Sequence, residues 1–318
     1  MPAPHPLLVH AALFVVSLLF GVNFVGMKII LHELDAGSWA MYRVAGATLV
    51  LVPLSWLIAT KRALPPRRTL LWLLPAAILG VGGNQLLFVM GLKLTTPAHS
   101  SVITATIPIL TVVAAVVARQ ERIRWERALG IALACSGVLT LFRVDELVAG
   151  RGGSFDHNVL IGDLLTVANA SGYAVYLVMM RRIGRDVEAP IATAICFVYS
   201  TLFVLPFGLG AFDRSNLAIV VSPPILGWAL FAILGSTAIT YLLNVWALRH
   251  TGSSQVALYI YIQPVVATTL SIAMGRDEPG TRFFVAAGLV LAGLLANTVP
   301  QLVRARRAPR DRIATVPE

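Results

Sequence analysis

Charged residues are scarce in this chain of 318 residues. Asp, Glu, Lys and Arg make up 13% of it and hydrophobic residues 57%, whereas an average soluble domain carries about 25% charged residues. The mean hydropathy is correspondingly high, at +0.80. A soluble core could not absorb this surplus of apolar side chains. The composition therefore excludes an ordinary soluble domain and predicts that the lipid bilayer is the solvent for most of the chain.

Cysteines and the short motifs of soluble enzymes are also rare or absent. The two cysteines, Cys135 and Cys196, both fall within apolar segments, where we expect small buried side chains and no disulfide bond. The sequence contains no P-loop, no His-Glu-x-x-His, no Cys-x-x-Cys and no nucleophile elbow. We therefore expect neither an enzyme nor an ATP-driven pump, and we expect no cofactor and no metal site.

Long apolar segments dominate the chain instead. A helix of about 20 apolar residues crosses a hydrocarbon core about 30 Å thick. The first segment, Leu7 to Ile30, has no Lys or Arg before it, unlike a cleaved signal peptide, and we expect it to be retained as the first helix. Polar or Pro-rich breaks separate the segments. The predicted spans are 7–30, 37–60, 70–92, 96–118, 125–142, 159–181, 189–211, 225–248, 253–274 and 282–303.

Lys and Arg are unevenly distributed over the connections between these spans. With the N-terminus inside, the inside segments hold 17 basic residues and the outside segments seven. Short cytoplasmic loops retain positive charge during membrane insertion. We therefore predict a multi-pass protein of the inner membrane with both termini in the cytoplasm. The basic tail, residues 304–318, is either a topology signal or a contact with anionic lipid, so the net charge of +10 does not indicate nucleic acid binding.

The sequence repeats itself with a shift of 156 positions. Without a gap, this shift places Pro108 on Pro264 and Gly137 on Gly293. With an odd number of helices per repeat, the second copy enters the membrane from the opposite side, and inverted halves of this kind mark many secondary transporters. We predict a first repeat at 7–142, an outer linker at 143–158 and a second repeat at 159–303.

Short motifs occur at defined places in both halves. The first half contains Leu-Phe-Gly-Val-Asn-Phe at 19–24, Ala-Met-Tyr-Arg at 40–43 and Ile-Pro-Ile at 107–109. The second half contains Gly-Asp-Leu-Leu at 162–165 and Gln-Pro at 263–264. These motifs resemble those of the EamA-type transporters of the drug/metabolite transporter superfamily. The resemblance implies an all-α integral membrane protein with ten transmembrane helices in two inverted five-helix EamA-like repeats, and export of amino acids, related metabolites or toxic small molecules.

Polar side chains within the apolar spans are costly in lipid and therefore face the bundle interior or a water-filled cavity. Asn, Gln and Tyr are better candidates than Ser or Thr, whose hydroxyls can bond to their own helix. Neutral hydrogen-bonding groups among aromatic rings suit a zwitterionic or amphipathic solute. We predict a substrate pathway lined by Asn23, Asn84, Gln85, Tyr173, Tyr241, Asn244, Tyr259 and Gln263.

Three charged residues lie toward the predicted outer ends of their helices. Arg43 is well inside an apolar span, and we expect its side chain to snorkel outward. The alternative is an outer gate in which Arg43 pairs with Glu33, Asp35 or a carboxylate of the substrate. Lys28 and Asp163 lie at a similar depth, which makes an outward-facing ion-pair gate a hypothesis.

Acids are missing from the middle of every predicted span, so the acidic relay of a proton-driven pump is not visible. We expect facilitated or exchange-type movement. His99 is either an ordinary interfacial group or the site of weak proton coupling. Pro108 and Pro264, at matching places in the two halves, predict helix kinks, which serve either as hinges or as static packing features.

These patterns together predict a secondary transporter. It would export small metabolites, amino acids or related amphipathic solutes, by alternating access at a midplane cavity between the inverted repeats. The alternatives are a multidrug or toxic-compound exporter, a membrane-embedded enzyme acting on lipids, and a membrane scaffold without transport. The expected partners are a small-molecule substrate and membrane lipid, but no nucleic acid, and the protein is expected to be a monomer or a homodimer.

Overall fold

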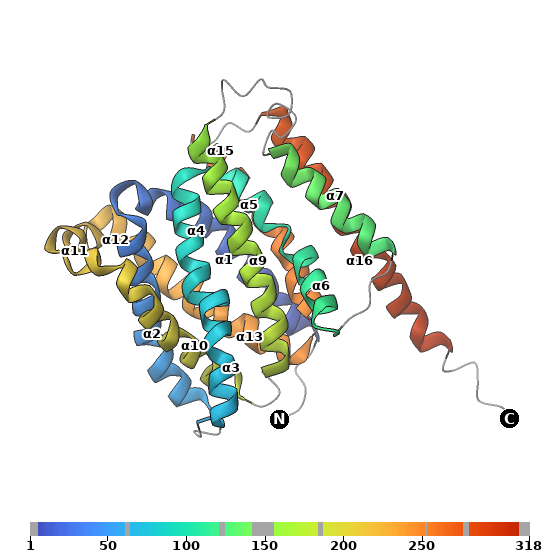
Figure 1. Ribbon diagram of the computed structural model, residues 1–318, viewed down its shortest axis with the longest axis horizontal. Helices are drawn as coiled ribbons and strands as arrows, with labels where there is room; N and C mark the ends of the chain where they lie inside the picture. The colour runs from blue at the N-terminus through green and yellow to red at the C-terminus, as the bar shows by residue number, and fades with distance from the viewer. Residues whose placement is uncertain are drawn as a thin grey trace.

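A computed structural model describes residues 6–60, 64–120, 125–141, 156–183, 187–251, 253–275 and 280–311, and within these ranges the chain is a bundle of helices without strands (Figure 1). The first part forms α1 (Pro6–Glu33), α2 (Ala36–Ile58), α3 (Arg67–Ala77), the π-helix η1 (Ile78–Gly82), α4 (Gly83–Leu94), α5 (Pro97–Thr104), α6 (Ile107–Val117) and α7 (Trp125–Leu141). The second part forms α9 (His157–Ile183), α10 (Ala189–Val204), the 3-10 helices η3 (Leu205–Phe207) and η4 (Leu209–Phe212), α11 (Arg214–Val220), α12 (Pro223–Leu230), the π-helix η5 (Phe231–Ile239), α13 (Thr240–His250), α14 (Ser253–Leu258), the 3-10 helix η6 (Tyr259–Tyr261), α15 (Ile262–Ala273) and α16 (Thr281–Asp311).

Seven helical segments of the described chain are long and apolar enough to cross a membrane. Three shorter apolar helices, Ala128–Gly137, Tyr259–Ala273 and Thr281–Gly293, accompany them. The structure therefore describes a multi-pass membrane protein, and ten crossing helices remain a prediction. The seven segments are Leu7–Glu33, Ala36–Ile58, Arg67–Leu94, Pro97–Val117, His157–Ile183, Ala189–Phe207 and Pro223–His250.

The outer surface of the bundle carries large apolar side chains. Leu49, Val117 and Leu202 are exposed to the surroundings, which in water would favour aggregation but in a membrane faces the lipid chains. Cys196 is buried as expected, whereas Cys135 on α7 is exposed, and both thiols are free. The last helix, α16, continues to Asp311, beyond the predicted end of the last span. Most of the predicted linker and residues 312–318 of the predicted tail lie outside the described residues.

The helix boundaries follow the same shift of 156 positions as the sequence. α3 begins at Arg67 and α12 at Pro223, while α7 begins at Trp125 and α16 at Thr281. The π-helices η1 and η5 also occupy overlapping positions under this shift. π-helices are rare in proteins. Their agreement in position supports the internal repeat.

The boundary between α1 and α2 is set by a helix cap. The Asp35 carboxylate accepts a hydrogen bond from the Ser38 backbone N–H at 2.8 Å, at the start of α2. Burial acts to raise the pKa of the Asp35 carboxyl, but hydrogen bonds from Ser38 and Gly37 and the charge of Lys93 outweigh it and hold that pKa below its usual value. The cap therefore stays ionised at neutral pH, as a helix N-terminus favours.

Both predicted proline kinks occur as breaks between helices. α5 ends at Thr104 and α6 begins at Ile107, so that Pro108 is the second residue of α6. The 3-10 turn η6 comes just before α15, whose third residue is Pro264. Proline has no N–H to donate, and its ring clashes with the carbonyl four residues earlier. This clash accounts for the interruption before each proline.

The two parts of the chain are joined by close contact between α4 and α9, which lie side by side (Figure 1). A Cβ added to Gly91 would lie 2.9 Å from the Gly162 carbonyl oxygen, and one added to Gly162 would lie 2.8 Å from the Gly91 oxygen. Farther along, the Asn84 amide donates to the Asn169 carbonyl at 3.1 Å and the Asn169 amide to the Asn84 carbonyl at 2.8 Å. Small residues and reciprocal amides thus hold the helices together.

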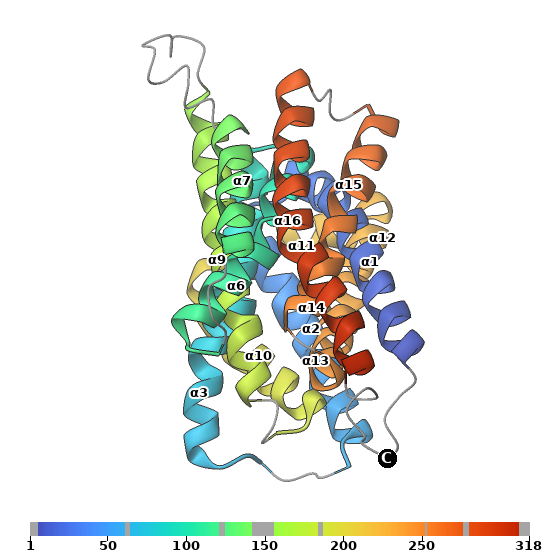
Figure 2. The ribbon, with the colours of Figure 1, turned by 90° about the vertical axis from the view of Figure 1, so that its right-hand side faces the viewer.

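The first and the last described helices reach the same end of the bundle. The beginning of α1 and the end of α16 point toward the same end of the molecule, where α2 also ends and α3 begins (Figure 2). α7 and α16 pair with each other at one edge (Figures 1 and 2). The side of the membrane on which the termini lie remains a prediction.

Candidate functional site

A cavity lies among α1, α2, α4, α5, α6, α9, α13, α14, η6 and α15. Its wall is mostly apolar, with Phe20, Phe24 and Phe88 among the lining side chains. All eight residues predicted to line the substrate pathway are part of the wall, and so is Arg43. The eight are Asn23, Asn84, Gln85, Tyr173, Tyr241, Asn244, Tyr259 and Gln263.

The cavity extends from the middle of the bundle toward the end at which α1 begins. Its lining residues run from Leu13 to Phe24 on α1 and from Asn169 to Leu177 on α9. The Phe24 and Phe88 rings meet edge to face at 5.3 Å, and the Arg43 guanidinium lies 5.9 Å from the Phe88 ring centre. We call the region around Arg43, Phe24 and Phe88 the deep end of the cavity.

Arg43 does not snorkel outward, which corrects the expectation from the sequence. Its side chain is buried at 1% exposure. Nε donates to the Thr237 hydroxyl at 2.7 Å, and a terminal nitrogen donates to the Ser236 hydroxyl at 3.2 Å. These hydroxyls replace water as acceptors and allow the guanidinium to remain inside the bundle.

The predicted acidic partners of Arg43 are engaged elsewhere. The Glu33 carboxylate contacts His32 at 2.9 Å, and Asp35 caps α2. Among the described residues, no carboxylate forms an ion pair with Arg43. The buried guanidinium therefore faces the cavity with only neutral acceptors around it.

Sequence reasoning did not single out Ser236 and Thr237. Hydroxyls in apolar helices usually bond to their own backbone, and both of these also do so, to the Ala232 carbonyl. The Ser236 hydroxyl additionally lies 2.6 Å from the Asn23 amide oxygen. The only signal in the sequence was two adjacent hydroxyl residues directly after the apolar first half of the predicted span 225–248.

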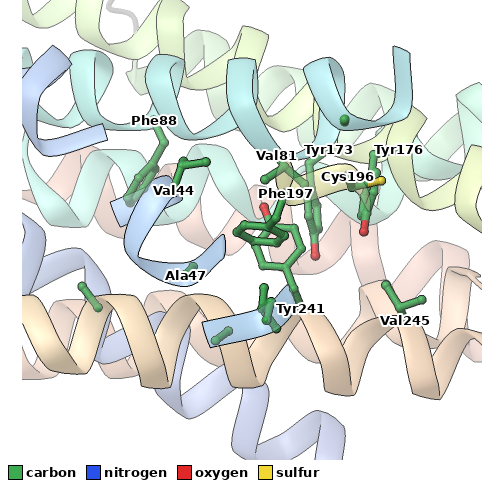
Figure 3. Packing of buried hydrophobic residues seen from close by; sticks show 14 of the residues in the cluster. Val44, Ala47, Val81, Phe88, Tyr173, Tyr176, Cys196, Phe197, Tyr241 and Val245 are labelled. Carbon is green, nitrogen blue, oxygen red and sulfur yellow. The ribbon is translucent and has the colours of Figure 1, made fainter. Parts of the chain in front are cut away.

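An aromatic cluster lies at the side of the cavity near α13, where Tyr173 and Tyr241 line the wall. The rings of Tyr173, Tyr176, Phe197 and Tyr241 gather there (Figure 3), with centroids of neighbouring rings 5.1 to 6.3 Å apart. The Tyr241 hydroxyl donates to the Gly80 carbonyl at 2.8 Å, and the Asn244 amide donates to the Tyr173 hydroxyl at 3.1 Å. These bonds fix the orientation of the Tyr241 and Tyr173 rings.

The predicted amides are not equally available to a solute. The Asn84 donor is used in the α4–α9 contact, whereas the Gln263 amide makes no hydrogen bond within the described part of the chain and is open to the cavity. At the other end, the Tyr259 hydroxyl lies 2.6 Å from Nδ1 of His10. His10, which sequence reasoning missed, sits near the start of α1 and contacts the cavity wall through Tyr259.

Lys28 and Asp163 belong to a separate cluster beyond the deep end. Lys28 Nζ donates to the Leu92 carbonyl at 2.8 Å and to the Thr95 carbonyl at 2.6 Å, where α4 ends. The Thr95 hydroxyl donates to Asp163 at 2.5 Å, and His99 Nδ1 lies 3.2 Å from the same carboxylate. Asp163 is buried at 1% exposure. We call Lys28, Thr95, His99 and Asp163 the outer cluster.

The structure does not bring the three charged residues of the predicted gate together. Lys28 is four residues beyond Phe24 on α1, about 6 Å farther along the helix. Arg43 instead points into the cavity, toward Ser236 and Thr237. The acceptors on η5 and the acceptors at the end of α4 attract the two basic side chains to different places.

A multi-helix membrane bundle with a central, largely apolar cavity has the architecture of a transporter. The family model of the EamA-like transporter family matches residues 7–143 and 160–299. The chain belongs to this family, which is part of the drug/metabolite transporter superfamily, and it is a transporter rather than an enzyme.

Individual relatives agree with this assignment. The chain is 26% identical over 299 residues to an uncharacterized transporter of Archaeoglobus fulgidus, covering 92% of this chain and 98% of that protein. It is 23% identical over 291 residues to the uncharacterized transporter YetK of Bacillus subtilis, covering 89% and 86%. A protein known from a crystal structure shares the fold at a TM-score of 0.58 and 18% identity, covering 92% of this chain and 97% of that one.

Proposed function

We propose that this protein is a secondary transporter that exports small amphipathic metabolites, such as amino acids or related solutes, across the inner membrane. The observation that carries the proposal is the central cavity, which collects polar side chains from both halves of the chain. Asn23 and Gln85 come from the first half, and Asn244 and Gln263 from the second. A mostly apolar wall with a few placed polar groups suits a solute that has both kinds of surface.

Alternating access between two inverted halves, residues 7–142 and 159–303, is the proposed mechanism. Ten crossing helices would give each half five, and substrate sites in such transporters lie between the repeats. The breaks before Pro108 and Pro264 provide matching places at which the halves can bend. The expected mode is facilitated or exchange-type movement.

The side of the membrane to which the cavity opens follows from the charges of the predicted connections and from the position of the cavity in the bundle. The cavity extends toward the end of the bundle that holds the start of α1 and the end of α16. The connections predicted on that side hold most of the Lys and Arg residues, and such an excess of positive charge favours a cytoplasmic location for that side. A cavity open to the cytoplasm would load its solute there, in keeping with export.

The outer cluster is the proposed closure on the opposite side. Lys28 lies on α1, His99 on α5 and Asp163 on α9, and Thr95 joins them at the end of α4. Because these helices come from both halves, opening the outer side would separate the halves and break these contacts. We propose that Lys28 and Asp163 act as gate residues through this cluster, without Arg43.

Substrate counterflow in proteoliposomes tests the proposed function. We expect the wild-type protein to exchange at least one solute from a panel of amino acids and small organic acids, amides and amines. Gln263→Leu is expected to weaken apparent affinity for that solute about tenfold, because one open amide contributes hydrogen bonds of about 1 to 1.5 kcal/mol.

Asn158→Leu is the matched control, since Asn158 is exposed on the first turn of α9, away from the cavity. It should leave the exchange unchanged. Failure of the folded wild-type protein to exchange any solute of the panel would contradict the proposal.

A further inference from the structure

We infer that the deep end of the central cavity is an anion-binding site, in which Arg43 holds a carboxylate group of the transported solute. The inference rests on the proposed function and names its substrate class: small organic acids with an apolar or aromatic body, including amino acids. The evidence is a charge buried in the cavity wall with no ion-pair partner among the residues that the structure describes.

Arg43 carries a positive charge that is buried in the cavity wall. A guanidinium group stays protonated in proteins, and a buried charge is expensive unless it is paired. Arg43 is the only charged residue among the described side chains that line the cavity. No carboxylate of the described chain forms an ion pair with it. An anion entering the cavity would supply the missing partner.

The Arg43 guanidinium has more N–H donors than it has acceptors among the described residues. Arginine has five N–H groups, and three of those of Arg43 have an acceptor among the described residues: the hydroxyls of Thr237 and Ser236, and the Met27 sulfur at 3.5 Å. Sulfur is a weak acceptor. Donors therefore remain for a carboxylate, which guanidinium binds with two parallel hydrogen bonds.

Hydrogen bonds to η5 hold the Arg43 guanidinium in place. Nε and one terminal nitrogen are bound to adjacent residues of η5, Thr237 and Ser236. Ser236 is in turn bonded to Asn23 on α1. The guanidinium plane is thus fixed by two neighbouring helices, which lowers the entropy cost of binding an anion. An arginine used only to brace α2 against η5 would not need to line the cavity.

Aromatic side chains lie beside the Arg43 guanidinium at the deep end of the cavity. Phe24 and Phe88 lie beside Arg43, and Phe20 continues the apolar wall toward the mouth. A carboxylate at Arg43 would place the rest of the solute against these rings. A hydrophobic cation would instead meet a like charge at the deep end, which disfavours the multidrug alternative.

Binding to matched probes tests the inference on the purified full chain. The probes are 3-phenylpropanoate, 3-phenylpropanamide and 3-phenylpropylammonium, with 4-methylpentanoate and 4-methylpentanamide as an aliphatic pair. Titration calorimetry and thermal shift should show that each carboxylate binds at least about tenfold more tightly than its amide, because charge-assisted hydrogen bonds are the stronger ones. The ammonium probe should not bind.

Three variants assign the preference to Arg43. Arg43→Gln should remove the preference for carboxylate over amide, and Arg43→Lys should retain part of it, because lysine keeps the charge but not the two-pronged donor. Arg182→Gln removes the same charge from an exposed position near the end of α9 and should keep the full preference. If Arg43→Gln does not fold, Ser236→Ala, which removes one of the acceptors, should weaken carboxylate binding by a smaller factor.

The outcomes separate this inference from the proposed function. Equal binding of carboxylates and amides by the wild-type protein, a preference that survives in Arg43→Gln, or no binding of either carboxylate would each overturn the anion site. Counterflow of a neutral or cationic solute would then leave the transport function standing. If probes bind with the expected preference but no solute undergoes counterflow, the anion site stands as a binding site and the proposed transport function fails.

Discussion

Gly162→Leu is expected to lower the stability of the folded protein by at least about 3 kcal/mol, the upper part of the range for overpacked positions. A Cβ at Gly162 would lie 2.8 Å from the Gly91 carbonyl oxygen, 2.9 Å from Leu94 Cβ and 2.9 Å from the Thr95 backbone nitrogen. Two of these three atoms belong to the backbone, so no change of side-chain rotamer relieves the clash. α4 and α9 would have to move apart. Thermal unfolding of the purified protein in detergent measures the loss.

The control for this prediction is Gly227→Leu. Gly227 lies on α12, and no atom lies within 4 Å of a Cβ added there. The same substitution should therefore leave the melting temperature unchanged or raise it slightly, since glycine costs about 0.5 to 1 kcal/mol in a helix relative to alanine. Equal melting temperatures for the two variants would show that the α4–α9 contact is looser than the structure indicates.

Asp163→Leu is expected to disrupt the outer cluster and to reduce counterflow at least about tenfold. The Thr95 hydroxyl would lose the acceptor that it contacts at 2.5 Å, and His99 would lose its contact at 3.2 Å. Each buried polar group left without a partner costs about 1 to 3 kcal/mol. The closed arrangement of the outer side would be destabilised by this amount. Counterflow rates and melting temperature, measured on the same preparation, report the two effects.

A graded series sharpens this prediction. Asp163→Asn keeps one oxygen for Thr95, so its melting temperature should fall between those of the wild-type protein and Asp163→Leu. Asp213→Asn is the control, because Asp213 is an exposed cap of α11 that accepts from the Ser215 backbone N–H, and asparagine caps helices equally well. If Asp163→Leu transports at the wild-type rate, the outer cluster is not a gate.

Much of the fold could be predicted from the sequence because a bilayer imposes local rules. Each crossing helix satisfies its own backbone hydrogen bonds, and the membrane thickness sets its length. For this reason the predicted span 37–60 differs from α2 by one residue at its start and two at its end, and 96–118 differs from the combined range of α5 and α6 by one residue at each end. The shift of 156 positions was equally visible, because glycines and prolines mark the same bends in both halves.

The polar residues of the cavity were predictable for a related reason. Amides and tyrosine hydroxyls are costly in lipid, and this cost alone places Gln85 and Asn244 in the interior, where the structure finds them. The partner of each polar group could not be predicted, because partners lie far apart in the sequence. Asn84 is engaged by Asn169, 85 positions away, and this contact occupies one of the two N–H donors of its amide.

The sequence by itself determined that this chain is a helical membrane protein with an internal repeat and a polar interior, because composition, helix length and loop charge are local properties. Only the tertiary structure decided where the charges lie. Arg43 turns inward because Thr237, 194 positions away, presents a hydroxyl to it. Lys28 and Asp163 meet instead at Thr95. A buried charge is placed by the acceptors that packing brings to it, and packing joins residues that no local pattern connects.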